Sequence, residues 1–370
     1  DHSQSDPIIS SSDARTQEMP PMPSQNDQST PLQSITRRDS LKIIAATTGT
    51  LALTSPTLAS ILRSASSADP LLTWSELKPS FHAFVDLNTG GNVLLRTSKD
   101  AIIMIDTKYP HLAGAIKADA ENFTRAESKN GSPKLILINT HHHGDHTAGN
   151  PLIVPHADES YAHKNAIPRI QSQLDTTKQS GKNAVDRIKG FSDSKALKDL
   201  AQQAADASDS WTNKEVTPAT AIDAKATDIP GTDITLHHFG PGHTDNDLVV
   251  QFKDDNVFHT GDLVFSGLHP YFDPTAGVSA MGWLVALGTL YQLCDKDSII
   301  IPGHGEPGDR TIIQNQIDYL TQILIEVQKQ IDAGTSKEDT ASMEWDFMKG
   351  LGFESIRERA INAVYDELAS

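Results

Sequence analysis

Residues 140–146 read Thr140-His141-His142-His143-Gly144-Asp145-His146, directly after the apolar run at 135–139. A short apolar run that ends in polar residues predicts a buried strand with a loop at its end. In an extended loop side chains alternate, so His141 and His143 lie on one side and hold one metal ion. Asp145 and His146 are free to reach a second ion, about 3.5–4 Å from the first in two-metal sites. Imidazole and carboxylate ligands suit zinc.

Three further segments place a histidine or an aspartate after a predicted strand. Each also contains glycine, which lets the backbone turn tightly and bring a ligand towards a metal. The segments are Gly240-Pro241-Gly242-His243-Thr244, His259-Thr260-Gly261-Asp262 and Ile301-Pro302-Gly303-His304-Gly305. Four polar strand ends of this kind indicate one shared metal centre.

In the order HxHxDH, GH, GD and GH, these motifs cover residues 81–306 and resemble the metallo-β-lactamase-fold hydrolase superfamily. The resemblance implies an α/β fold, an αββα sandwich of two mixed β-sheets packed face to face with helices on both outer faces. It implies two zinc ions per chain, and it assigns Asp145 and His243 to catalysis as well as to metal binding. The implied ligands are His141, His143 and His243 for the first zinc, Asp145, His146 and His304 for the second, and Asp262 as a bridge.

Zinc chemistry then predicts the reaction. Zinc lowers the pKa of a bound water to about 7, so hydroxide is available to attack an ester, thioester or amide. Metal-bound histidines commonly donate their other ring nitrogen to a partner. Asp106, at the end of the predicted strand 101–105, and His142, which points away from its neighbours, are the candidates for supporting the ligands in this way.

Residues near the bridge separate the branches of the superfamily. The first subclass of metallo-β-lactamases has a cysteine where this chain has Asp262, and a lysine where it has Phe265. A bridging aspartate is similar to glyoxalase II, as is the run from Thr140 to His143. Lactonases of the superfamily have a tyrosine near the position of Phe265, and Tyr271 is a possible substitute. We expect Phe265, His269 and Tyr271 to line the substrate pocket.

Other functions stay open at this point. A β-lactamase is one alternative, although the third subclass typically lacks an aspartate at the bridge. Another is an iron-dependent oxidoreductase, because some relatives bind iron. A non-catalytic binding protein is disfavoured, since all the ligand positions are filled. The chain has 31 Lys and Arg against 48 Asp and Glu, a net charge of −17, which repels a phosphate backbone and disfavours a nuclease or any nucleic-acid partner. We therefore expect a small-molecule substrate.

The N-terminal part of the chain predicts export. Residues 1–35 are rich in Ser, Pro and Gln and are expected to be disordered. Residues 36–68 resemble a twin-arginine signal, with Arg37-Arg38 before a short apolar run and small residues at its end. This predicts the twin-arginine translocase as a transient partner, a periplasmic or secreted location, and no stable membrane anchor.

Residues 69–370 are expected to form the metallo-β-lactamase-fold domain, with a helical insertion at 157–211 and C-terminal helices at 311–370. The single cysteine, Cys294, excludes a disulfide scaffold. Apolar runs predict strands at 92–96, 101–105, 135–139, 234–238, 248–252, 257–260 and 298–301. Helical spacing predicts helices at 112–125, 281–293, 311–332 and 353–368.

Overall fold

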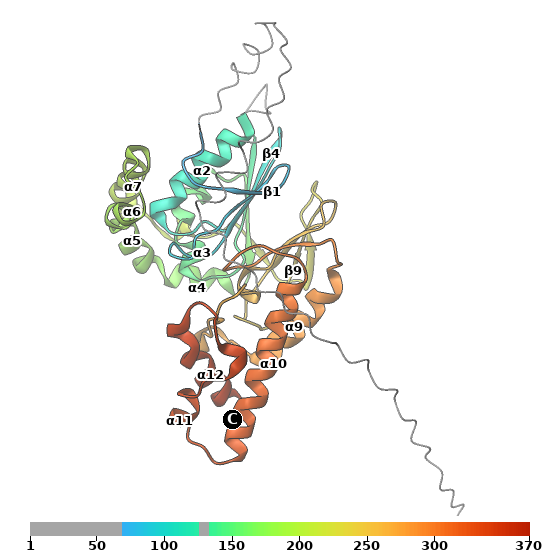
Figure 1. Cartoon of the computed structure of the whole chain (residues 1–370). Helices are drawn as coiled ribbons and strands as arrows, with labels where there is room; N and C mark the ends of the chain where they lie inside the picture. The colour runs from blue at the N-terminus through green and yellow to red at the C-terminus, as the bar shows by residue number, and fades with distance from the viewer. Residues whose placement is uncertain (1–68, 126–132) are drawn as a thin grey trace, which may run out of the picture. The chain divides into compact units, whose positions relative to one another are not determined.

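Two β-sheets form the centre of the fold, and the structure, a computed structural model, describes residues 69–125 and 133–370 (Figure 1). The predicted disordered segment and the predicted export signal lie outside the described residues. The described residues belong to one unit by their contacts. None of their helices is both long enough and apolar enough to cross a bilayer.

The first sheet has seven strands in sequence order. The pairs from β1 to β4 are antiparallel and the pairs from β4 to β7 are parallel, so the sheet is mixed. Its strands are β1 (Ser75–Lys78), β2 (Phe81–Phe84), β3 (Val93–Thr97), β4 (Ala101–Ile105), β5 (Lys134–Ile138), β6 (Glu159–His163) and β7 (Thr220–Ile222).

The second sheet has five strands in the order β12-β11-β10-β9-β8. Its strands pair antiparallel except for β11 and β12, which run parallel. The strands are β8 (Ala226–Asp228), β9 (Ile234–His237), β10 (Val249–Phe252), β11 (Val257–His259) and β12 (Ile299–Ile301).

Alternating side chains explain why the central strands are apolar throughout. In β4, Ile103 and Ile105 join the core between the two sheets, while Ile102 and Met104 face the helices outside. Side chains of a strand alternate between faces, so a strand covered on both sides is apolar at every position. The two sheets therefore pack face to face with a third apolar layer on each outer side, as the sequence predicted.

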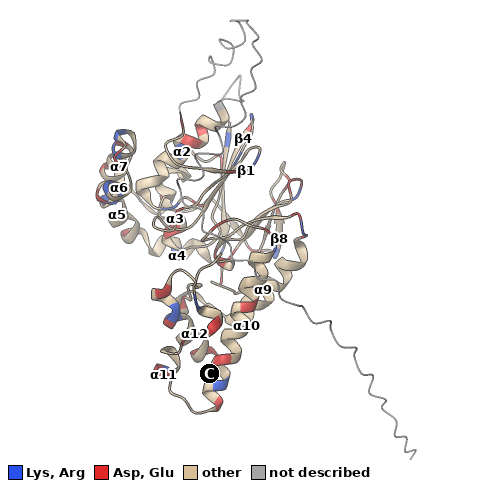
Figure 2. Cartoon of the chain, viewed as in Figure 1, with Lys and Arg blue, Asp and Glu red and all other residues tan. Residues whose placement is uncertain are grey.

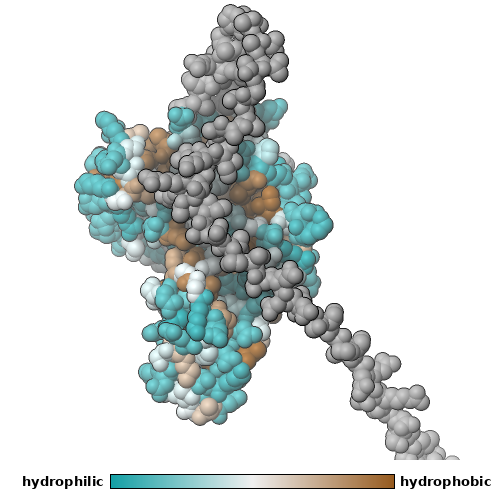
Figure 3. Space-filling model, viewed as in Figure 1, coloured by the Kyte–Doolittle hydropathy of each residue, from teal (hydrophilic) through white to brown (hydrophobic). Residues whose placement is uncertain are grey.

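Helices supply those outer layers. The helix α2 (Pro110–Arg125) covers the first sheet, with α6 (Ala184–Phe191) and α7 (Lys195–Ala207) in the same apolar cluster. The second sheet is covered by α9 (Ala280–Leu293), α10 (Thr311–Asp332) and α12 (Arg357–Ala369). The outer surfaces of α5–α7 and α10–α12 carry charges of both signs and are mostly hydrophilic (Figures 2 and 3).

The segment 157–211 is not helical from its start, which corrects the predicted insertion. Glu159–His163 form β6, because Ser160 to His163 are buried and pair with β5 and β7. Helices follow as α4 (Ala166–Ser172), α5 (Leu174–Lys182), α6 and α7, and then α8 (Asn213–Val216). At the C-terminal end, α11 (Lys337–Ala341) lies between α10 and α12 in the chain.

The core between the sheets gives a direct test of the sandwich. Leu94 in β3 is fully buried there. We expect Leu94→Ala to lower the free energy of unfolding by about 2–5 kcal/mol, because the lost side chain leaves a cavity. Leu293→Ala, on the exposed side of α9 at 43% exposure, is the control and should change it by less than about 1 kcal/mol. Urea titration followed by circular dichroism measures both, and equal effects would contradict the assigned core.

Candidate metal centre

The predicted ligands all lie in loops or short turns at strand ends. His141 and His143 follow β5, and the short helix α3 (Gly144–Thr147) then carries Asp145 and His146. His243 lies in the loop between β9 and β10. Because β11 and β12 run parallel, the residues after them meet at one sheet edge, and Gly303 N donates to Gly261 O between the two loops. The arrangement of the strands, whose ends lie close together, thus explains why ligand candidates far apart in the chain converge.

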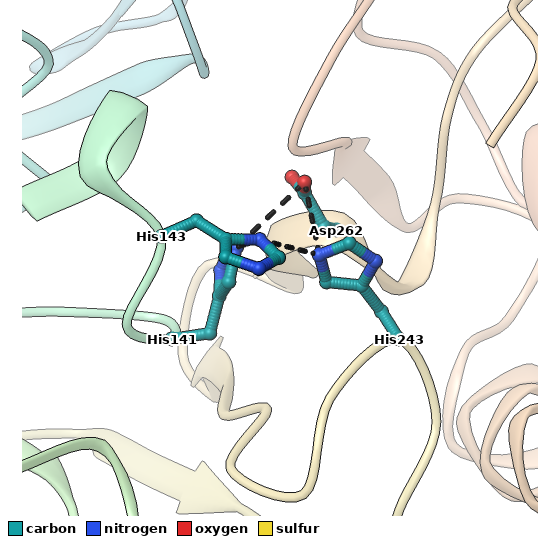
Figure 4. A group of neighbouring side chains, drawn as sticks. All are labelled: His141, His143, His243 and Asp262. Atoms are coloured by element: carbon teal, nitrogen blue, oxygen red, sulfur yellow. Dashed lines mark hydrogen bonds and ion pairs between the residues drawn. The ribbon is translucent and has the colours of Figure 1, made fainter. Parts of the chain in front are cut away.

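The first group comprises His141, His143, His243 and Asp262 (Figure 4). The Nδ1 atom of His143 lies 3.1 Å from Nε2 of His141 and 2.9 Å from Nε2 of His243. Asp262 Oδ2 completes the group, 3.7 Å from His141 Nε2 and 3.4 Å from His243 Nε2. Four residues from three separate segments of the chain therefore point their ligand atoms into one small volume.

The second group comprises Asp145, His146 and His304. The Nε2 atoms of His146 and His304 are 3.4 Å apart, and His304 Nε2 is 3.2 Å from Asp145 Oδ2. Asp262 reaches this group as well, since its Oδ1 lies 3.0 Å from His146 Nε2 and its Oδ2 lies 3.5 Å from His304 Nε2. Asp262 is thus placed between the two groups, as a bridging ligand must be.

Hydrogen bonds on the outer side of the rings determine which nitrogen faces inward. His146 Nδ1 donates to Asp106 Oδ2 at 2.8 Å, and His243 Nδ1 donates to Tyr271 O at 2.9 Å. His143 uses its other nitrogen, since Nε2 lies 3.0 Å from Asp273. A neutral imidazole that donates from one nitrogen has a lone pair on the other. These rings therefore turn the opposite nitrogen towards the centre of each group, where its lone pair can bind a metal ion once the ring is neutral.

The spacing of the donor atoms suits a metal ion. Ligand atoms around a tetrahedral zinc with bonds of about 2.1 Å are roughly 3.4 Å apart, close to the separations within both groups. Asp262 Oδ1 is buried and has no hydrogen bond of good geometry, although His146 lies nearby. An unsatisfied buried carboxylate oxygen is costly. The nitrogen and oxygen donors of both groups therefore fit a metal ion.

The charges of the cluster favour the same conclusion. Burial opposes ionisation of Asp262, but His146, His304 and His141 hold its pKa well below its usual value. Burial likewise opposes ionisation of Asp145, but His146 and His304 outweigh it and lower the pKa of this carboxyl group. Both carboxylates are therefore ionised at neutral pH. When His146 and His304 lose their protons, these two buried negative charges would attract a divalent cation.

Glycines allow the loops to approach the ligands closely. A Cβ on Gly91 would lie 2.0 Å from Cε1 of His146, and a Cβ on Gly303 would lie 1.9 Å from Oδ1 of Asp262. Non-bonded atoms do not approach this closely, so a side chain at either position would displace a candidate ligand. The glycine of the Gly303-His304 motif is explained by this contact with Asp262.

The two predicted supporting residues differ in role. Asp106 is fully buried and holds the ligand loop from behind, because it accepts hydrogen bonds from the backbone and hydroxyl of Thr140 and from His146. His142 does not point away from all the ligands as predicted, because its ring lies beside that of His143, with centroids 4.5 Å apart, and His142, His143 and Asp273 form a further group that could hold a metal ion. Its backbone and ring also bond Asn246. It therefore fixes the loop of His243 to the histidine loop, while Asp106 orients a ligand directly.

A cavity of about 680 Å³ opens onto the metal groups. His143, Asp145, Asp262 and His304 are the ligands in its lining. His243 is fully buried and does not line this cavity, so its position fits a metal ligand better than a group that meets the substrate, and its predicted catalytic role stays a prediction. Asp145 keeps contact with the cavity and is the ligand carboxylate best placed to meet a substrate.

Two of the three predicted pocket residues line this cavity. Phe265 stacks on the ring of His304 with centroids 5.2 Å apart, and Tyr271 lies edge-on to His143. His269 was predicted wrongly as a pocket residue. It is fully buried away from the cavity, where its ring nitrogens lie 3.0 Å from the Tyr319 hydroxyl and 3.1 Å from Glu354.

Several functional positions escaped the sequence reasoning. Asp273, which holds His143, stands in the same loop as Tyr271 and was detectable as the acidic residue nearest to the pocket candidates. Asp247 accepts hydrogen bonds from the backbone and hydroxyl of Thr244 and so shapes the turn after His243. Phe353, Ser355 and Ile356 also line the cavity. They are over 90 positions from Asp262, and no local signal marks them.

Comparison with known proteins identifies the family of the chain. The family profile described as "Metallo-beta-lactamase superfamily" matches residues 88–304, and the chain belongs to this superfamily. A metallo-beta-lactamase type 2 of Bacillus cereus is 27% identical over 81 residues, which are 22% of this chain. The match spans about a third of that relative, 32% of its length.

Solved structures of similar fold include two metallo-beta-lactamases. The DIM-1 enzyme is 16% identical with a TM-score of 0.48, over 68% of this chain and 97% of the other. The FIM-1 enzyme of Pseudomonas aeruginosa, in its mono-zinc form, is 17% identical with a TM-score of 0.47, over 70% of this chain and 98% of the other.

Proton release should distinguish the two metal groups. Burial lowers the pKa of His304, but the charges of Asp262 and Asp145 outweigh it and raise this pKa to about 9. Burial also lowers the pKa of His146, but Asp262, Asp145 and Asp106 together raise it well above its usual value. Both rings are therefore protonated at pH 7 and must lose a proton to bind a metal. Burial, the largest effect, lowers the pKa of His141 and His243, the latter to about 3.

We therefore expect zinc binding to the second group to release roughly one to two protons at pH 7, with an affinity that rises with pH up to about 9. Binding to the first group should release few protons from His141 or His243. Calorimetric zinc titration in two buffers of different ionisation enthalpy measures the release for each equivalent. Equal release for both equivalents would show that the assigned charges are wrong.

Proposed function

We propose that the chain is an exported dinuclear zinc hydrolase that cleaves an ester, thioester or amide bond. Membership of the metallo-beta-lactamase superfamily and the clustered ligands support a metal-binding hydrolase as its class. The observation that carries the proposal is the position of Asp262, whose two oxygens lie within reach of both donor groups. Zinc there would supply an acidified water as nucleophile and a positive charge for the developing oxyanion.

The protein residues around the site favour hydrolysis of a bound small molecule. Asp106, Asp273 and the carbonyl of Tyr271 hold three ligand rings rigidly, so little reorganisation is needed during a reaction. Asp145 lies in the cavity lining beside His304 and is within reach of a proton of the substrate or of its leaving group. The aromatic rings of Phe265 and Tyr271 exclude water from one side of the site.

The donor set supports zinc without excluding iron. All the ligand atoms are nitrogen or oxygen, and such donors suit both metals. The single cysteine, Cys294, is buried at the end of α9 and lies in neither group. An iron-dependent oxidoreductase of the same superfamily is therefore the alternative that metal analysis decides.

A β-lactamase is the second candidate, and the local match to the Bacillus cereus enzyme favours it. Two residues argue against the type with a metal-binding cysteine. Asp262 provides an oxygen donor at the bridge, and Phe265 stacks on His304 where a cation for a lactam carboxylate is expected. The bridging aspartate supports a thioesterase of the glyoxalase II kind instead, although export sets this chain apart from an enzyme that acts on thioesters inside cells.

Removal of the bridge tests the dinuclear proposal. We expect Asp262→Ala to reduce bound zinc from about two per chain to one or fewer, and to lower kcat/KM on 4-nitrophenyl acetate at least ~100-fold, because both groups lose a ligand. Asp297→Ala removes an exposed carboxylate that pairs with Lys296 far from both groups in the chain and should change neither value.

Elemental analysis measures the metals, and a chelated sample of each protein provides the metal-free baseline. One iron per chain, or full activity after chelation, would contradict the zinc hydrolase. A panel of nitrocefin, a simple thioester and the nitrophenyl ester then separates the substrate classes, since nitrocefin turnover alone would favour the β-lactamase.

Export rests on residues 36–68, which lie outside the described residues. We expect the full chain to reach the periplasm of a bacterial host that has a functional twin-arginine translocase, and the double change Arg37→Lys with Arg38→Lys to block this. Arg63→Lys, outside the paired arginines, is the control. Cell fractionation with immunoblotting detects the protein, and export that ignores the double change would refute this signal.

A further inference from the structure

One wall of the cavity at the metal groups is built by the helices α5 and α6. The residues that they contribute recur at intervals of three or four positions, which is the spacing of one helical face. This face therefore points into the cavity along both helices, which are separated only by Asn183. The residues on it, with Gln173 just before α5, are Gln173, Thr176, Thr177, Gln179, Ser180, Asn183 and Arg187.

This wall is polar and carries one positive charge. Its side chains are amides and hydroxyls apart from Arg187, which is the only Lys or Arg in the described lining of the cavity. The acidic residues of the same helices, Asp175 and Asp186, are not part of the lining. In a chain of net charge −17, a cation beside the reaction site is a distinctive feature of the pocket.

Arg187 is held in place but not neutralised. Its guanidinium lies 4.5 Å from the centroid of the Tyr109 ring, a cation–π contact. Among the described residues, no carboxylate lies within ion-pair distance of it, whereas the neighbouring Lys189 pairs with Asp186. The planar guanidinium thus keeps donors free for a ligand, and two parallel N–H donors match the oxygens of a carboxylate.

Tyr109 connects Arg187 with the metal groups. A Cβ on Gly90 would lie 2.9 Å from Cβ of Asp145 and 3.1 Å from Cε2 of Tyr109, so the tyrosine ring and the ligand aspartate flank the same glycine. Arg187 therefore lies one aromatic ring beyond Asp145. A substrate whose scissile bond is at the metals can extend past Tyr109 to the guanidinium.

The C-terminal segment gives the cavity an apolar side. Phe353 and Ile356 line it together with Phe265. Phe353 has a left-handed backbone with φ of 59° and packs edge-on against His304 at 5.6 Å between ring centroids. A non-glycine residue in this conformation is uncommon, and the strain is accepted here where the ring covers a ligand.

We propose that Arg187 binds a carboxylate of the substrate, so that the protein acts on esters, thioesters or amides that carry an anionic end and an apolar part. The apolar part packs against Phe353 and Ile356, while the polar face of α5 and α6 surrounds the anion. This inference rests on the proposed hydrolase function, since it identifies the substrate class of the same cavity. Arg187 is then the residue that determines specificity.

The test compares two ester series on the zinc-loaded full chain. One consists of mono-4-nitrophenyl esters of dicarboxylic acids from succinate to suberate, and the other of uncharged branched esters of matching length. We expect at least one anionic ester to be preferred over its uncharged match. Arg187→Ala should raise KM for that ester about tenfold, which corresponds to about 1.4 kcal/mol, with kcat and the uncharged esters changed less than about twofold.

Matched variants separate the anchor from other effects. Lys189→Ala removes one positive charge from the same helix outside the cavity, so it should leave both series unchanged. Arg187→Lys should restore part of the preference, and high salt should weaken it. Equal losses on both ester series in Arg187→Ala, or an equal effect of Lys189→Ala on the anionic ester, would overturn the proposal.

A binding measurement keeps the inference testable if no ester is hydrolysed. The 4-nitroanilides of glutaric acid and of 5-methylhexanoic acid differ in the charged end, and calorimetry measures their affinity for the zinc-loaded chain. Tighter binding of the glutaric compound that is lost in Arg187→Ala would support the anchor even if the hydrolase proposal fails. Binding that is equal in both proteins would overturn it.

Discussion

The metal centre depends on a set of hydrogen bonds that lie outside it. Asp106 accepts a proton from His146, Asp273 holds His143, and the carbonyl of Tyr271 accepts from His243. Each bond turns the opposite nitrogen inward, so that its lone pair can bind a metal ion when the ring is neutral. Ring nitrogens and carboxylates held this close repel one another unless a proton or a metal ion lies between them. The sandwich is the frame that keeps these bonds in register.

The two sheets provide that frame because each supplies ligands at one edge. The first sheet ends β5 in the histidine loop, and the second ends β11 and β12 in the loops of Asp262 and His304. The apolar core between them fixes the distance across which the two donor groups meet. Helices on the outer faces then define the cavity, with α5 and α6 on one side and the segment before α12 on another.

The residues that would bind the metals and the residues that would select a substrate come from different parts of the chain, and they meet at the cavity. Ligand residues come from loops at the sheet edge, where the backbone is held by buried partners such as Asp106. Residues that can select a substrate come from helices added to the sandwich, including Arg187, and from the strained turn at Phe353. This division lets the wall change without disturbing the metal ligands.

The sequence by itself predicted most strand positions and the loops that carry the candidate ligands, because these depend on local signals, while its resemblance to the superfamily implied the sandwich and the ligand roles. Apolar runs of five residues mark strands such as β4 and β5, and His or Asp beside glycine marks the loops that follow. Only the tertiary structure decided that β6 precedes the helices, that His269 faces Tyr319 rather than the cavity, and that Arg187 lies beside Tyr109. Those facts depend on contacts between residues far apart in the chain, which no spacing in the sequence encodes.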